Sequence, residues 1–217
     1  MHSFHIRRVA VLGAGVMGAQ IAAHLVNARI PVTLFDLPTE VGHDPSAIAR
    51  KAIAGLSKMK PAPLGRAADA SLIQAANYND DLAALGACDL VIEAIAERLD
   101  WKHGLYEKIA PHLSAHAILA SNTSGLSISA LGAPLPDELA SRFCGVHFFN
   151  PPRYMALVEL IATPRTDPRV VDQLESFVTT SLGKSAIRAK DTPNFIANRI
   201  GSAGLLSTFV EAERYGL

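Results

Sequence analysis

A histidine and a glutamate stand inside two apolar segments, where an unpaired polar side chain is costly. His147 lies within Phe143–Phe149 and Glu159 within Leu157–Ile161. The intervening Asn150-Pro151-Pro152 is typical of a turn and can fold the two segments into neighbouring strands. A histidine among apolar residues is, by itself, more often a core residue than a catalytic one. Beside a carboxylate, however, the imidazole can take the proton of a hydroxyl group while the carboxylate stabilises the imidazolium.

A glycine-rich segment follows directly after the apolar run Val9–Leu12 and opens a helical pattern. Its sequence is Gly13-Ala14-Gly15-Val16-Met17-Gly18. Gly13 permits a tight turn, Gly15 lets the backbone approach a pyrophosphate, and Gly18 lets the helix pack closely on the strand. The N-terminus of the helix then offers free N–H groups and a partial positive charge to phosphates. The segment therefore predicts a dinucleotide site.

An acidic residue stands at the end of the second apolar run, as a dinucleotide site requires. Asp36 follows Val32–Phe35 and lies 23 positions after Gly13, close to the usual offset of about 20. Its carboxylate can accept hydrogen bonds from ribose hydroxyls and would repel a 2′-phosphate, and no basic residue follows in Leu37-Pro38. This favours NAD over NADP. The alternative is that the glycines form an ordinary turn and that Asp36 only caps the end of its strand.

Two further polar sets are candidates for holding ligands. Ser121-Asn122-Thr123-Ser124 follows the apolar run Ala117–Ala120, at the strand end where ligands bind in open α/β sheets. An ordinary helix N-cap cluster is the alternative. Asn198 lies among apolar neighbours on a helical run after Pro193, so its amide needs partners. A helix–helix hydrogen bond is the alternative there.

These residues require a framework of alternating strands and helices. Several apolar runs are continuous, as in parallel strands covered on both faces. The predicted strands are Val9–Leu12, Val32–Phe35, Leu90–Ile92, Ala117–Ala120, Gly145–Phe149 and Leu157–Ile161. The predicted helices are Val16–Ala28, Pro45–Met59, Trp101–His112 and Arg169–Leu182. The alternation predicts an α/β fold with a Rossmann-type, doubly wound, mostly parallel sheet. Between the first helix and second strand, Arg29 occupies a position where a left-handed cap would favour glycine.

Near Lys190–Pro193 the pattern changes and indicates a domain boundary. A helical run then continues to Tyr215 with more apolar residues than a terminal helix should expose. We expect residues 1–190 to form the dinucleotide-binding domain. Residues 191–217 are expected to be the first helix of an all-α C-terminal domain that is incomplete in this chain.

The overall composition excludes several classes of function. Lysine plus arginine and aspartate plus glutamate both total 20, so the formal net charge is zero, and we expect no nucleic-acid partner. Cys88 and Cys144 form no metal-ligand pattern and are expected to be buried thiols in a reducing compartment. Arg7-Arg8 before an apolar run imitates a signal peptide, but the glycines at special spacing argue against one. We expect no membrane insertion, no metal and a cytoplasmic location.

Together these motifs resemble the 3-hydroxyacyl-CoA dehydrogenase family. The resemblance runs from about Ile6 to the end of the chain. It rests on Gly13–Gly18 with Asp36, Val91–Glu97, Ser121–Ser124, His147–Pro151, Leu157–Glu159, and Lys190–Pro193 with Asn198-Arg199. It implies NAD-dependent oxidation of an L-3-hydroxyacyl-CoA to a 3-ketoacyl-CoA in fatty-acid β-oxidation. It also implies a homodimer for the full-length form.

The resemblance also implies individual roles. His147 becomes the catalytic base and Glu159 its partner, and Ser124 and Asn198 orient the substrate. Glu97 and Lys102 become contacts near the nicotinamide half of NAD, with Ser124 touching both ligands. The family's lysine contact to acyl-CoA falls on Lys58 or Lys60, either of which can equally be a solvated surface charge.

Two alternatives remain open at this point. One is a β-hydroxyacid dehydrogenase acting on a small free acid, but those enzymes use a catalytic lysine, and the His147/Glu159 pair argues against them. The other is an NAD-binding module or crystallin-like protein with little catalysis, because the rest of the C-terminal domain is missing.

Overall fold

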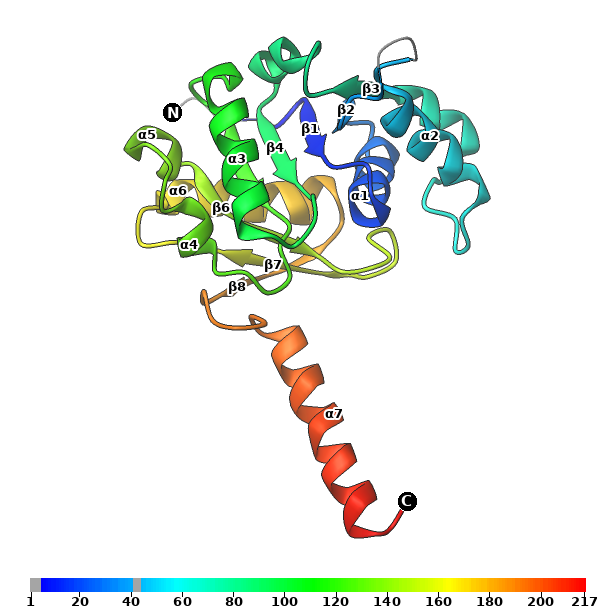
Figure 1. Cartoon of the computed structure of the whole chain (residues 1–217), viewed down its shortest axis with the longest axis vertical. Coiled ribbons are helices and arrows are strands. Elements are labelled where there is room, and N and C mark those ends of the chain that lie inside the picture. Colours follow the sequence, from blue (N-terminus) through cyan, green and yellow to red (C-terminus); the bar gives the residue numbers. More distant parts are fainter. Residues whose placement is uncertain (1–4, 41–43) are drawn as a thin grey trace.

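An eight-stranded sheet forms the centre of the protein, in a computed structural model that describes residues 5–40 and 44–217. The strand order is β3-β2-β1-β4-β5-β6-β7-β8 (Figure 1). The strands are β1 (Val9–Leu12), β2 (Val32–Asp36), β3 (Ile73–Asn77), β4 (Leu90–Glu93), β5 (Ile118–Ser121), β6 (Phe143–Phe148), β7 (Leu157–Ile161) and β8 (Ser185–Ala189).

The sheet is parallel apart from one pair. Only β6 and β7 run antiparallel, in a register that places His147 opposite Glu159. Strand order reverses between β1 and β4, because β2 and β3 extend the sheet in one direction and β5 to β8 in the other. Ligands bind at the carboxyl ends of strands beside such a reversal. The predicted doubly wound α/β architecture is therefore confirmed.

Helices cover both faces of the sheet (Figure 1). The covering helices are α1 (Val16–Asn27), α2 (Ala47–Gly55), α3 (Leu99–Ile109), α4 (Ile128–Gly132), α5 (Asp137–Ala140) and α6 (Pro168–Ser176), and they are followed by α7 (Ala197–Arg214), which lies outside the sheet (Figure 1). Successive side chains of β1 enter different cores: Val9 and Val11 pack with the cluster beneath α1, α2 and α6, while Ala10 and Leu12 pack with the one beneath α3, α4 and α5. Burial on both faces explains why this strand is apolar throughout.

Two strands were not predicted from the sequence, and both lie at the edges of the sheet. Residues of β3 read Ile-Gln-Ala-Ala-Asn, and β8 includes the exposed, ion-paired Arg188. Edge strands have one partner and a solvated side, so they lack the continuous apolar pattern that marked the central strands. A 3₁₀ turn, Ala67–Leu72, leads into β3.

The predicted helices exist, but their ends differ from the expected ones. The run predicted as Pro45–Met59 is helical from Ala47 to Gly55 and then tightens into a 3₁₀ turn, Leu56–Lys58. The run predicted from Trp101 begins at Leu99, and the last predicted helix ends in a π-type turn, Phe177–Ser181. Such 3₁₀ and π segments are about one turn long, which is too short for an apolar period to reveal them in the sequence.

Arg29 adopts the left-handed conformation suggested by its position, with φ of 64°. Its guanidinium lies 3.0 Å from Asp69, which also pairs with Arg66. The left-handed backbone costs an arginine about 1 kcal/mol relative to glycine. The ion pair joins the α1–β2 turn to the segment before β3.

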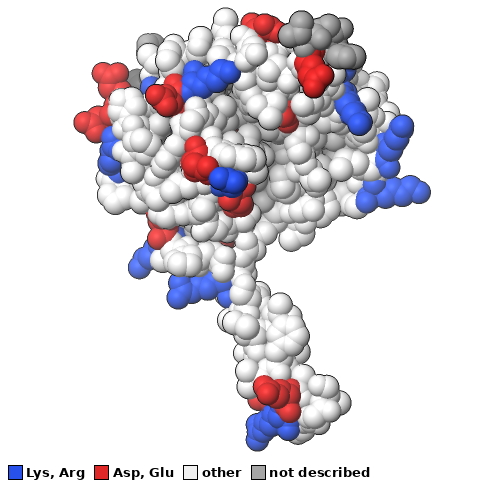
Figure 2. Space-filling view, in the orientation of Figure 1, with Lys and Arg blue, Asp and Glu red and all other residues white. Residues whose placement is uncertain are grey.

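Helix α7 extends away from the sheet (Figure 1). Its apolar side chains are more than half exposed: Ile200, Leu205, Leu206, Phe209 and Val210. The middle of this helix is largely uncharged in Figure 2, and charged residues gather near its C-terminal end. Over the body of the molecule in the same view, charges of both signs are interspersed.

Both cysteines are buried and free, as expected. Burial raises the pKa of Cys88 to about 11 and that of Cys144 to about 12, so both remain thiols at neutral pH. Within residues 5–40 and 44–217, no helix has both the length and the apolar content needed to cross a bilayer.

His24 on α1 gives the stability of the fold a specific pH dependence. Burial, followed by the positive charges of Lys184 and Arg153, lowers the pKa of His24 from 6.5 to about 4. The unfolded chain binds a proton here below about pH 6.5 while the folded one does not, so stability falls as the pH drops from 6.5 to 4. We expect this residue to contribute a loss of about 2 kcal/mol in unfolding free energy between about pH 7.5 and pH 5.

Urea denaturation at those two pH values measures the effect. His24→Gln removes the titration, so this variant should lose less stability on acidification than the wild type. Equal losses in the two proteins would show that another group is responsible.

Candidate active site

The structure brings His147 and Glu159 together. Nδ1 of His147 lies 2.8 Å from Oε2 of Glu159, across the antiparallel β6–β7 pair. The imidazole is 3% exposed and the carboxylate is fully buried. With Nδ1 facing the carboxylate, Nε2 is the ring nitrogen left to exchange a proton with a ligand. The pairing predicted from two apolar segments is therefore present in the fold.

The glycine-rich loop connects β1 to α1 at the carboxyl edge of the sheet. Gly13 has φ of +101°, and a Cβ there would meet the carbonyl oxygen of Ala94 at 2.8 Å. A Cβ on Gly18 would lie 1.8 Å from the carbonyl oxygen of Gly13. A Cβ on Gly15 would meet nothing within 4 Å. Gly13 and Gly18 are thus required by the fold itself, whereas Gly15 keeps open a space that a phosphate can enter.

Asp36 lies beside this loop at the end of β2. Its carboxylate accepts hydrogen bonds from the backbone N–H groups of Ala14, at 2.5 Å, and Leu37, at 2.7 Å. Each carboxylate oxygen retains further lone pairs that can accept bonds from ribose hydroxyls. The carboxylate is therefore fixed in place before any ligand arrives.

A cavity of about 760 Å³ opens over the loop and Asp36. Its walls come from the segments that follow β1, β2, β3 and β4 and from one face of α3. They comprise Gly13, Gly15, Asp36, Leu37, Pro38, Tyr78, Asn79, Ala94, Ile95, Ala96, Trp101, Gly104, Leu105 and Lys108. The mostly apolar lining with one carboxylate suits the adenosine half of a dinucleotide. The contribution of α3 to this wall was not predicted from the sequence.

Glu97 and Ser124 meet at the ends of β4 and β5. The Glu97 carboxylate accepts bonds from the Thr123 hydroxyl, at 2.7 Å, and from the Ser124 backbone N–H, at 2.5 Å. Burial alone would raise the pKa of Glu97, but these two bonds and the nearby Lys102 ammonium lower it overall. Glu97 is therefore negatively charged at neutral pH. The Ser124 side chain is exposed, within reach of a ligand at this edge.

Beneath Glu97 lies a buried polar cluster that the sequence did not predict. Lys102 Nζ lies 2.5 Å from one carboxylate oxygen of Glu93, and Tyr106 and Ser121 donate hydrogen bonds to the other, at 2.8 and 2.7 Å. Glu93 is fully buried and Lys102 is 1% exposed. The one available signal was a glutamate directly after the apolar run Leu90–Ile92, where a carboxylate needs partners.

The remaining predicted residues are placed as follows. Asn198 is the second residue of α7 and is half-buried. Lys58 and Lys60 are both exposed after α2, so the structure does not choose between them. Asn122 has a role that was not predicted: its side-chain oxygen accepts a bond from the Phe148 N–H at 2.9 Å and ties β5 to β6.

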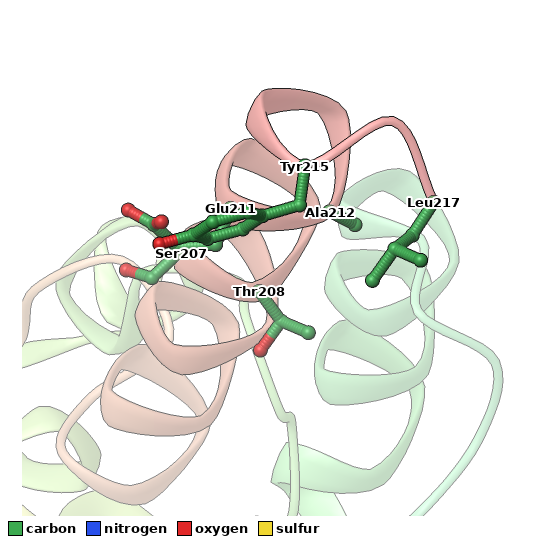
Figure 3. A pocket seen from close by; sticks show the side chains of 6 residues that line it. All are labelled: Ser207, Thr208, Glu211, Ala212, Tyr215 and Leu217. Carbon is green, nitrogen blue, oxygen red and sulfur yellow. The ribbon is translucent and has the colours of Figure 1, made fainter.

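A separate hollow of about 420 Å³ lies at the far end of α7 (Figure 3). Ser207, Thr208, Glu211, Ala212, Tyr215 and Leu217 line it. It is formed within the last turns of this helix and the tail that follows. It shares no residue with the dinucleotide cavity or the His147–Glu159 pair.

Comparison with known proteins assigns this arrangement to a family. A model described as the 3-hydroxyacyl-CoA dehydrogenase NAD-binding domain matches residues 8–192. The chain belongs to the 3-hydroxyacyl-CoA dehydrogenase family. The matched residues include the glycine-rich loop, Asp36 and both members of the His147–Glu159 pair. NAD is the cofactor that the family's domain binds, in agreement with the open space at Gly15 and the carboxylate of Asp36.

Individual relatives give the same assignment. A probable 3-hydroxyacyl-CoA dehydrogenase of Deinococcus radiodurans is 43% identical over 212 residues, covering 98% of this chain and 61% of the relative. A putative fatty acid oxidation complex trifunctional enzyme of Rickettsia felis is 45% identical over 196 residues, covering 90% of this chain and 27% of the relative. The chain therefore spans about three-fifths of the first of these relatives and about a quarter of the second.

Solved structures of similar proteins share the fold. FadB2 of M. tuberculosis superposes with a TM-score of 0.83 at 31% identity, covering 99% of this chain and 74% of that one. The (S)-3-hydroxybutyryl-CoA dehydrogenase of Ralstonia eutropha superposes with a TM-score of 0.75 at 33% identity, covering 90% and 68%.

Proposed function

We propose that this chain catalyses the NAD-dependent oxidation of an L-3-hydroxyacyl-CoA to a 3-ketoacyl-CoA, a step of fatty-acid β-oxidation. The main support is the buried His147–Glu159 pair, whose side chains lie 2.8 Å apart. The pair belongs to the same sheet whose strand ends border the proposed dinucleotide cavity. The names of the relatives support the substrate class. The L-stereochemistry follows from the family resemblance alone.

In the proposed reaction the C3 hydroxyl group loses its proton to Nε2 of His147. The C3–H bond breaks, its electron pair leaves as hydride, and the C–O bond becomes a carbonyl. Bound NAD, held at the glycine-rich loop and Asp36, would supply the acceptor for that hydride. Glu159 stabilises the imidazolium through Nδ1–H, and the imidazolium later releases its proton to solvent.

Other residues are proposed to position the two ligands. Ser124 and Asn198 orient the substrate hydroxyl, and Ser124 also faces the nicotinamide half of NAD. Glu97 is the proposed polar contact to that half. Because Lys102 is buried and bonded to Glu93, we assign it to holding Glu97, 3.4 Å away, in place of the direct NAD contact that the resemblance implied.

Three further features remain proposals. Residues 191–217 are proposed to begin a helical domain, because an exposed apolar helix is typical of one that packs against further structure. Acyl-CoA contact by Lys58 and a homodimer of the full-length protein are predicted from the family resemblance. A cytoplasmic location is likewise a prediction.

The test compares 3-hydroxybutyryl-CoA with free 3-hydroxybutyrate as substrates for NAD reduction by this chain. We expect turnover of the CoA thioester and little or none of the free acid. Preference for the free acid would support a β-hydroxyacid dehydrogenase. NAD binding without turnover of either would support an NAD-binding module with little catalysis, the alternative that the partial coverage of the relatives leaves open.

A second prediction concerns the open space at Gly15. Gly15→Ala introduces a methyl group that touches no protein atom within 4 Å, so the fold should be preserved. The methyl group occupies the space proposed for the pyrophosphate, so NADH affinity should fall about 10- to 100-fold, equivalent to about 1.4–2.8 kcal/mol.

NADH fluorescence titration measures this affinity. Gly55→Ala, at the end of α2, is the matched control, because a Cβ there also meets nothing within 4 Å. Unchanged NADH affinity in Gly15→Ala would show that the pyrophosphate does not bind beside Gly15.

A further inference from the structure

The connection between β8 and α7 has an unusual backbone. Asn194 and Phe195 are consecutive non-glycine residues with left-handed conformations, φ of 62° and 49°. The Phe195 N–H donates to the carbonyl oxygen of Thr192 at 2.9 Å. A left-handed non-glycine residue costs free energy and persists only where its surroundings fix it. This turn, residues 191–197, is therefore held by contacts with its surroundings.

The turn places the Phe195 side chain against the proposed catalytic base. Phe195 is 2% exposed, and its ring centroid lies 5.7 Å from that of His147, tilted by 58°. The ring of Phe149 lies against the same imidazole at 4.4 Å. Two aromatic rings therefore confine the imidazole, one from its own strand end and one from the turn.

The same turn also binds the partner of the base. Oε1 of Glu159 accepts hydrogen bonds from the backbone N–H groups of Ile196, at 3.0 Å, and Ala197, at 2.9 Å, while Oε2 faces His147. The first N–H groups of a helix have no partner within the helix, so α7 depends on this carboxylate. One carboxylate thus links the imidazole to the start of α7.

The other end of the turn is anchored independently. The Asp191 carboxylate accepts bonds from the Ser127 hydroxyl, at 2.8 Å, and from the N–H groups of Ile128 and Ser129, at 2.9 and 2.8 Å. These bonds fix the turn to the start of α4. The segment is therefore tied at both ends by carboxylates, with Phe195 between them.

From these contacts we infer that the turn 191–197 is a positioning element for the base, with Phe195 as its positioning residue. This inference rests on the proposed function. Phe195 restricts the rotation of the imidazole ring. The N–H groups of Ile196 and Ala197 hold the Glu159 carboxylate in the orientation that lets it bond to Nδ1 of His147. Asn198 lies directly after these N–H groups on α7, so the turn also sets the distance between the base and the proposed substrate-orienting amide.

Phe195→Leu tests the inference, because leucine keeps an apolar side chain but removes the ring from the imidazole. Phe177→Leu is the matched control, because Phe177 is also buried, at 6% exposed, but belongs to the hydrophobic cluster on the other face of the sheet from that of Phe195. The readouts are NADH affinity, the rate of acetoacetyl-CoA reduction at saturating NADH, and the solvent exchange of the His147 Nδ1 proton, followed by NMR with ¹⁵N-labelled protein.

We expect Phe195→Leu to keep NADH affinity, to exchange the Nδ1 proton at least about tenfold faster, and to reduce the maximal rate about 10- to 100-fold, as for a misplaced catalytic group. Phe177→Leu should match the wild type in all three. Equal proton exchange and equal rates in the two variants would overturn the inference. If the wild type reduces no acetoacetyl-CoA, the proposed function fails, and the proton exchange still decides the role of Phe195.

A second pair of variants alters the turn without changing the aromatic ring. Proline at position 194 requires a negative φ near −65°, whereas glycine accepts the observed left-handed backbone. Asn194→Pro should therefore reproduce the faster Nδ1 exchange of Phe195→Leu, and Asn194→Gly should resemble the wild type. Identical exchange in the proline and glycine variants would contradict a positioning role for this turn.

Discussion

His147→Gln should bind NADH as the wild type does and lose a factor of about 10²–10⁴ in the rate of acetoacetyl-CoA reduction, the usual contribution of a general acid–base group. Glutamine is similar in length and can still donate a hydrogen bond to Glu159, 2.8 Å from the native ring nitrogen. It cannot exchange a proton in the neutral pH range, so the chemical step loses its proton donor and acceptor. Steady-state rates and NADH titration separate the two effects.

His112→Gln provides the control for this substitution. His112 is exposed in the 3₁₀ turn after α3 and lines neither the dinucleotide cavity nor the β6–β7 pair. Its replacement should leave both rate and affinity unchanged. Full activity of His147→Gln would require another residue to be the base and would reduce the His147–Glu159 pair to a structural one.

Glu93→Gln should destabilise the fold by about 3–5 kcal/mol, because it takes the nearer, fully buried carboxylate partner from the buried Lys102 ammonium and leaves it only the half-exposed Glu97 at 3.4 Å. The substitution keeps the size of the side chain, so it tests charge and hydrogen bonding without creating a cavity. The total stability of a domain is only about 5–15 kcal/mol, so the melting temperature should fall substantially. Urea denaturation measures the free energy directly.

Two comparisons isolate the buried pair. Glu175→Gln removes the carboxylate of an exposed ion pair with Arg188 and should cost no more than about 1 kcal/mol. The double variant Glu93→Leu/Lys102→Met removes both buried charges and should recover much of the loss, as apolar replacements of buried pairs do. If Glu93→Gln lowered the unfolding free energy as little as Glu175→Gln does, the buried ion pair between Lys102 and Glu93 would contribute little to stability.

The central sheet could be predicted from the sequence because its strands are covered on both faces. Val9–Leu12 and Leu157–Ile161 have the bounds expected from their apolar runs. The edge strands β3 and β8 were missed because one side of each is solvated and their side chains are mixed. Periodicity also failed at helix ends, where changes in winding depend on tertiary packing.

The proposed site could be predicted wherever its chemistry conflicts with its surroundings. Glu159 inside an apolar strand and glycines at fixed spacing after a strand both have few structural explanations. Phe195 and Glu93 were missed for opposite reasons. A phenylalanine in an apolar helical pattern has an ordinary core explanation, and its left-handed backbone has no sequence signature. The partners of Glu93 come from three separate elements that only the fold brings together.

Transfer of deuterium from NADH labelled at the reactive C4 position to acetoacetyl-CoA tests the proposed dehydrogenase activity most directly. We predict that this chain yields 3-hydroxybutyryl-CoA with deuterium at C3, detected by mass spectrometry, and that His147→Gln yields far less in the same time. Formation of no labelled product, with NADH bound and the chain folded, would contradict the proposal that this chain performs hydride transfer on a 3-hydroxyacyl-CoA.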